Sequence, residues 1–157
     1  MDSPQGSTSH WWNARESESP LFVTDLSSSQ GTLRIIDTAP QVPQERTIHL
    51  ADFVLIPVRP SPNDLRAVGD TLAVVERLHK PFCFVINAVK LRTRIATNTL
   101  QVLAQYGKVA PVMLGDRIDF AESMINGLAV VELDPNSRSA EEVTKLWTYV
   151  SEQLRKK

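Results

Sequence analysis

The chain has 157 residues, of which 42% are hydrophobic and 22% charged, a composition that excludes a disordered or fibrous protein. Its formal net charge of -1 gives no general attraction to nucleic acid or membranes, so either contact would need a local patch. The single cysteine, Cys83, excludes an internal disulfide framework. Because there is no apolar run of membrane-spanning length and no signal-peptide core, we expect a cytoplasmic protein with no membrane contact.

Short apolar runs alternate with helical patterns along the chain. A short helix is predicted through Trp11–Arg15, and the triplet Leu21–Val23 is a further strand candidate. The runs predicted as strands are Leu33–Asp37, Asp52–Val58, Phe82–Ile86 and Val109–Met113. The main segments predicted as helices between and after them are Gln44–Ala51, Ser61–Leu78, Thr93–Tyr106, Phe120–Ile125 and Ser139–Leu154. This order predicts one α/β domain over residues 1–157, with three layers and a mostly parallel sheet of four or five strands covered by helices on both faces.

Two of the helices have clear start signals. Ser61 is followed by Pro62 and Asp64, which is the order of an N-cap, a proline at the first helical position and an acidic first turn. The last helix is predicted to open with a capping box at Ser139–Glu142 and to pack Trp147 inward.

Asp37 closes the first predicted strand, and Pro40 breaks the chain soon afterwards. Ligands of open α/β sheets bind at the carboxyl ends of the strands, and a carboxylate there suits Mg²⁺, a hard cation that prefers oxygen ligands. An Asp that only caps a turn is the alternative. The stretch by itself leaves both interpretations open.

Four blocks of the sequence resemble the ParA/MinD family of deviant Walker-type P-loop ATPases, which position plasmids, chromosomes and other cargo. Three of them are Ile35–Pro40, Leu50–Pro62 and Phe84–Asn87. The fourth, Asp2–Ser7, is similar to the Asp-Pro-Gln-Gly segment of the family's nucleotide switch. The resemblance implies a P-loop NTPase-like fold that binds ATP and Mg²⁺.

The chain departs from the family at the phosphate-binding loop. That loop needs glycines whose backbone N–H groups hold the phosphates, a lysine and a Ser/Thr. The one Gly-Lys pair, Gly107-Lys108, continues with Val109 and has Val102 at the position of the first glycine. Compared with the family, the chain resembles a member that lacks its first strand, P-loop and first helix. We therefore expect an incomplete P-loop NTPase-like fold. The two explanations are a truncated ATPase and a short protein that has lost catalysis.

The resemblance also assigns residues. It implies that Asp37 is linked to Mg²⁺ through a bound water, that Asn87 contacts the adenine region and that Gln5 belongs to the switch. An Asn that ends a strand through local hydrogen bonds is the alternative for Asn87. DNA contacts are expected from basic residues of the C-terminal half, with Arg117 the best single candidate; the others are Lys90, Arg92 and Arg94. Ordinary solvated surface charge is the alternative for each of them.

These assignments predict a ParA-like ATPase fragment that acts in plasmid or chromosome partitioning. In the complete protein the resemblance implies ATP-dependent homodimerisation, nonspecific DNA binding and a ParB-like adaptor protein, with nucleoid association through DNA. The competing hypothesis is a non-catalytic interaction module that pairs with a complete ParA-like ATPase, and a broader one is an unrelated Rossmann-like binding domain. In either ParA-like case, we predict that this chain alone does not hydrolyse ATP, because one carboxylate cannot replace the phosphate-binding amides and lysine.

Overall fold

A computed structural model describes residues 7–23, 33–38, 45–90 and 93–156 of the chain. Its elements in chain order are α1 (Ser7–Asn13), α2 (Glu45–Leu50), β1 (Val54–Val58), α3 (Pro62–Arg77), β2 (Phe82–Ile86), α4 (Arg94–Leu103), α5 (Asp119–Ile125), α6 (Val130–Leu133) and α7 (Arg138–Arg155). The fold is therefore mixed α/β, as predicted. Within the described residues, no helix is both long enough and apolar enough to cross a membrane.

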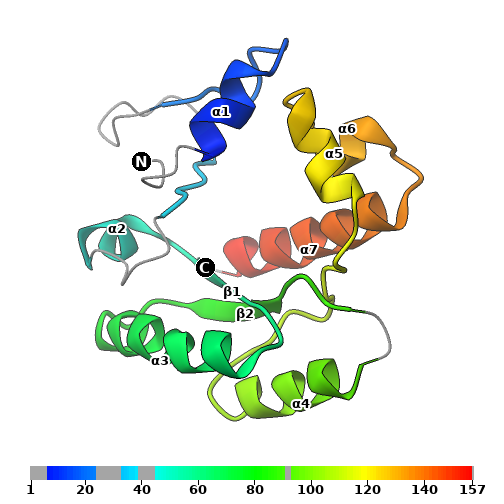
Figure 1. The fold of residues 1–157 in the computed structure, drawn as a ribbon. Helices are drawn as coiled ribbons and strands as arrows, with labels where there is room; N and C mark the ends of the chain where they lie inside the picture. Colours follow the sequence, from blue (N-terminus) through cyan, green and yellow to red (C-terminus); the bar gives the residue numbers. More distant parts are fainter. Residues whose placement is uncertain (1–6, 24–32, 39–44, 91–92, 157) are drawn as a thin grey trace.

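The centre of the fold is a two-stranded parallel sheet. β1 and β2 pair in register from Val54 opposite Phe82 to Val58 opposite Ile86. The predicted strand Phe82–Ile86 is confirmed residue for residue, and the prediction at Asp52–Val58 is confirmed for its last five residues. Figure 1 shows α3 and α4 on one side of this sheet and α7 on the other.

β2 is buried on both faces, which explains its uninterrupted apolar sequence. Phe84 and Ile86 belong to the main core cluster, which also contains Val75 of α3 and Leu103 of α4. The side chains of opposite parity, those of Cys83 and Val85, pack on the α7 side against residues that include Leu146 and Tyr149. Burial raises the pKa of the Cys83 thiol to about 11, against the smaller opposing effect of its hydrogen bond with Tyr149. Cys83 is thus a buried thiol of the core.

The prediction of a strand at Leu33–Asp37 is wrong. Residues 33–38 have no strand pairing, and Leu33 and Ile35 are 48% and 83% exposed. A strand needs a neighbour for its backbone N–H and C=O groups, and no described strand lies beside this segment. The apolar triplet Leu21–Val23 is likewise not a strand.

Val109–Met113 follows β2 but does not form a full strand. Ala110 N donates to Phe84 O, but the next bond, to Ile86 O, comes from Leu114 rather than from Val112. Two additional residues therefore bulge out of the pairing, at the place where Pro111 has no N–H to donate. The described residues thus form a smaller sheet than the four or five strands predicted.

The helix starts give one confirmation and one correction. Ser61 caps α3, since its side-chain oxygen accepts a hydrogen bond from Asp64 N, as predicted. The cap of α7 is Ser137 and not Ser139. Ser139 lies in the first turn, fully buried, where its hydroxyl donates to Asp119 Oδ2 at 2.6 Å.

The inward packing predicted for Trp147 is also wrong, because this side chain is 48% exposed. Its neighbour Leu146 packs on the sheet in its place, together with Tyr149. Adjacent helical residues point about 100° apart, so apolar residues at both positions 146 and 147 leave the buried face ambiguous from the sequence.

Candidate functional site

The carboxyl ends of β1 and β2 are tied together by Asn87. Its backbone N–H donates to Val58 O at 2.9 Å, and its Oδ1 accepts from Ala88 N at 2.8 Å. Ala88 has a positive φ of 52°, so the chain turns sharply after the strand. The structure therefore shows the local hydrogen bonding that was the alternative for Asn87, while the adenine contact stays a prediction.

Asp37 lies outside the sheet. Its Oδ2 accepts a hydrogen bond from the Thr8 hydroxyl of α1 at 2.6 Å, and the side chain is exposed. Among the described residues there is no group of three or more acidic, histidine or cysteine side chains that could hold a metal ion. The sequence also lacks the glycine-rich loop with its lysine. These residues therefore do not fit a Mg²⁺–ATP site by themselves, and the Mg²⁺ role of Asp37 stays a prediction from the resemblance.

The predicted basic residues are not equivalent. Lys90 and Arg94 are exposed and have no ion pair within the described part of the chain. Arg117 is half-buried and held by Glu142: Nη1 lies 2.5 Å from Oε2 and Nη2 lies 2.8 Å from Oε1. The same Glu142 Oε2 accepts from Gly115 N at 2.9 Å. Arg92, like Gln5, lies outside the described residues.

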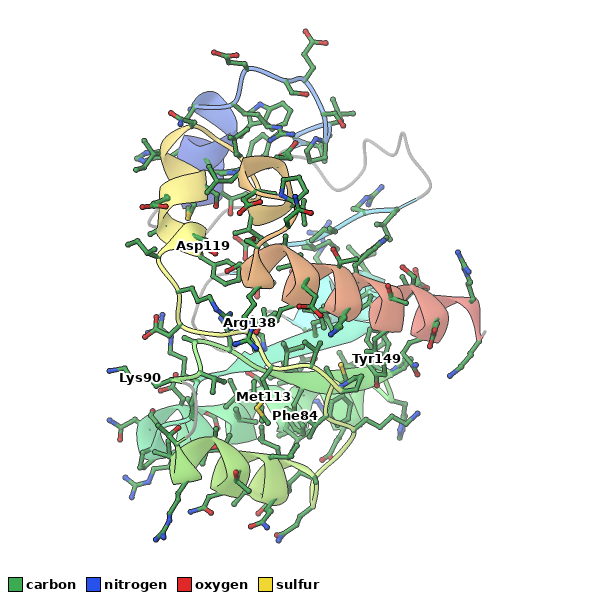
Figure 2. The ribbon with its side chains drawn as sticks, turned by 90° about the vertical axis from the view of Figure 1, so that its right-hand side faces the viewer. Phe84, Lys90, Met113, Asp119, Arg138 and Tyr149 are labelled. Atoms are coloured by element: carbon green, nitrogen blue, oxygen red, sulfur yellow. The ribbon has the colours of Figure 1, made fainter. Side chains whose placement is uncertain are left out.

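The ion pair of Arg117 and Glu142 joins the chain after β2 to the N-terminal part of α7. The hydrogen bond that Arg117 donates to Glu142 raises the pKa of the guanidinium above its usual value, so the arginine stays charged. A cavity of about 330 Å³ lies beside the pair. Its charged lining residues are Arg117, Arg138, Glu141, Glu142 and Lys145. Figure 2 shows Arg138 and Met113, which both line this cavity, on α7 and on the segment that runs beside β2.

A second ion pair, not predicted from the sequence, fastens the N-terminal part of the chain. Arg15 follows α1 and binds Glu132 of α6 through both guanidinium Nη atoms. The hydrogen bonds from Arg15 and from Ala129 N lower the pKa of Glu132 to about 2. Sequence patterns could not reveal this pair, because its members lie 117 positions apart.

No protein-family model matches the chain. Among curated proteins it is similar to the Maintenance of carboxysome distribution protein A of Halothiobacillus neapolitanus, with 26% identity. The alignment covers 87% of this chain and 74% of that protein. The similarity therefore extends over most of the mixed α/β fold and is distant.

Proposed function

We propose that this chain acts in ParA-like positioning of a cellular cargo, as a non-hydrolysing partner of a complete ParA-like ATPase. The observation that carries the proposal is the similarity to a carboxysome distribution protein along 87% of the chain. The family resemblance of the blocks around Asp37, β1 and Asn87 supports the same class of function. The proposal includes a complete protein with the fold of the family, in which three layers surround a larger sheet.

The chemistry of the chain supports a partner role over catalysis. No Gly-x-x-x-x-Gly-Lys-Ser/Thr pattern occurs in the sequence, so the groups that usually stabilise a transferring phosphoryl group are missing. Asp37 lies on a segment without strand pairing and is hydrogen-bonded to Thr8. A carboxylate without a phosphate cradle supplies little of the electrostatic stabilisation that such a reaction needs.

Exposed apolar side chains support association with another chain. Leu55 of β1 is 40% exposed and Trp147 of α7 is 48% exposed. Aromatic and aliphatic side chains of this kind are typical anchors of protein interfaces.

Nonspecific DNA contact by Lys90 and Arg94 is a second part of the proposal. Both side chains are exposed, and they lie close together in the sequence, around the start of α4. Contacts with phosphates need positive charge and no sequence code, so two accessible cations can contribute to them.

The test combines phosphate release with association. The purified chain is incubated with Mg²⁺ and ATP, with and without duplex DNA, and we expect background turnover. It is then mixed with a complete ParA-like ATPase from the same organism, and we expect co-sedimentation that Trp147→Ala weakens and the control Tyr106→Ala, at an exposed aromatic residue beyond α4, does not. Turnover by the chain alone that disappears in Asp37→Ala would contradict the non-hydrolysing role, and absence of any complex would contradict the partner role.

A further inference from the structure

The N-terminal segment 7–23 is fastened to the turn between α5 and α6 by hydrogen bonds from two side chains. Arg15, whose side chain is 7% exposed, binds Glu132 and also donates from Nη1 to Gly127 O at 2.7 Å. Trp11 Nε1 donates to Leu128 O at 3.0 Å. The Arg15 guanidinium lies 5.2 Å from the centroid of the Trp11 ring, so the two anchors also contact each other.

The backbone fits closely at the same place. Gly127 has a φ of 63°, and a Cβ atom built on it would collide with the backbone N and Cα of Arg15. Only glycine allows this approach, both because of the left-handed conformation and because of the collision. The backbone of the segment thus packs directly on the turn, in addition to the contacts of its charged groups.

Helix α1 depends on this seating. It has seven residues, far fewer than an isolated helix needs to be stable in water. Its stability must therefore come from tertiary contacts, which include those of Trp11 and of Arg15, just beyond its end.

The opposite end of α1 carries Thr8, which donates its hydroxyl proton to Asp37. The segment around Asp37 has no strand pairing, and Ile35 within it is 83% exposed. The bond to Thr8 therefore restrains the Asp37 carboxylate, and it needs Thr8 in the position that the folded α1 gives it.

We propose that residues 7–23 form a strap that holds the exposed Asp37 carboxylate through Thr8. When Arg15 and Trp11 are seated on the α5–α6 turn, α1 is ordered and Thr8 donates a hydrogen bond to Asp37 Oδ2. When the strap lifts, α1 loses its support and the carboxylate loses this hydrogen bond. Because coupling between two sites is reciprocal, a change at Asp37 also loosens the contacts at the α5–α6 turn.

The experiment measures hydrogen exchange in the full chain, with Glu132→Gln at one end of the strap and Thr8→Val at the other. We expect Glu132→Gln to speed exchange about tenfold in the amides of α1, and to speed carbodiimide labelling of Asp37. We expect Thr8→Val to speed exchange of the Trp11 indole proton, which marks the distant end. Glu122→Gln, at an exposed glutamate of α5, is the matched control and should change neither.

Faster exchange in α1 with no change in the labelling of Asp37 would overturn the proposal, because the two ends of the strap would then be independent. An unchanged Trp11 indole in Thr8→Val would overturn it as well. Gly127→Ala lifts the strap with every charged group retained and should reproduce the effect of Glu132→Gln. The β2 amides, such as that of Phe84, must stay protected in each variant, which shows that the rest of the fold is intact.

Discussion

Glu142 binds both Nη atoms of Arg117, at 2.5 and 2.8 Å, and so connects the chain after β2 to the N-terminal part of α7. The two side chains are 16% and 18% exposed, which limits screening by water. Because of this geometry, the first role of Arg117 is to stabilise the fold and not to form a surface contact.

Arg117→Ala should therefore lower the free energy of unfolding by about 2 kcal/mol, because Glu142 is deprived of two charge-assisted hydrogen bonds in a partly buried place. Urea unfolding followed by circular dichroism measures the change. Lys145→Ala is the control: this lysine forms an exposed pair with Glu141 and should matter little. Equal decreases in the free energy of unfolding of the two variants would show that the more buried ion pair stabilises the fold no more than the exposed one.

DNA binding should depend on Lys90 and Arg94 more than on Arg117. Replacing each of the first two by Gln should reduce the slope of log K against log salt by about 0.9 for every phosphate that the protein no longer neutralises. Arg117→Gln should leave the slope unchanged, since this guanidinium is bound to Glu142. Fluorescence anisotropy with a labelled duplex at several salt concentrations measures the slope. A reduced slope in Arg117→Gln alone would instead favour the role that the family resemblance implies for it.

The ion pair of Glu132 with Arg15 predicts a decrease of stability in acid. The pKa of Glu132 is about 2 in the folded chain and 4.5 in an unperturbed glutamate, so folding favours the ionised form. The stabilisation is complete above pH 4.5 and disappears as the pH falls towards 2. Glu132→Gln should therefore destabilise the chain at neutral pH and make urea unfolding less dependent on pH in this range, whereas Glu122→Gln should not. The same acid sensitivity in both variants would contradict the assignment.

Pro57 should protect the open edge of β1. Val54 N donates to Pro81 O, and Asn87 N donates to Val58 O. The backbone N–H and C=O groups of the even-numbered residues of β1 therefore point toward β2, and the backbone groups of Leu55 and Pro57 point toward the other edge. Because proline has no N–H, the outward edge lacks one donor, which discourages pairing with another strand. Pro57→Val should increase self-association in light scattering, and Pro135→Val, at an exposed turn, should not. Equal light scattering by Pro57→Val and the unchanged chain would contradict the protective role of Pro57.

The local elements of this protein could be predicted from its sequence. The strand Phe82–Ile86 was predictable because a short apolar run between turn residues fits a strand buried on both faces. The start of α3 was predictable because Ser61, Pro62 and Asp64 stabilise it through contacts within one helical turn. For α3 the decisive interactions join residues that are close in the chain, and for β2 the apolar run itself indicates burial on both faces.

The sequence by itself thus determined a mixed α/β fold and the position of β2 and of most helices. Only the tertiary structure decided that Leu33–Asp37 stays outside the sheet, that Leu146 and not Trp147 packs inward, and that Arg117 is held by Glu142. The physical reason is that a strand needs a neighbour, a helix buries the face that its surroundings cover, and an ion pair forms between groups that only the folded chain brings together.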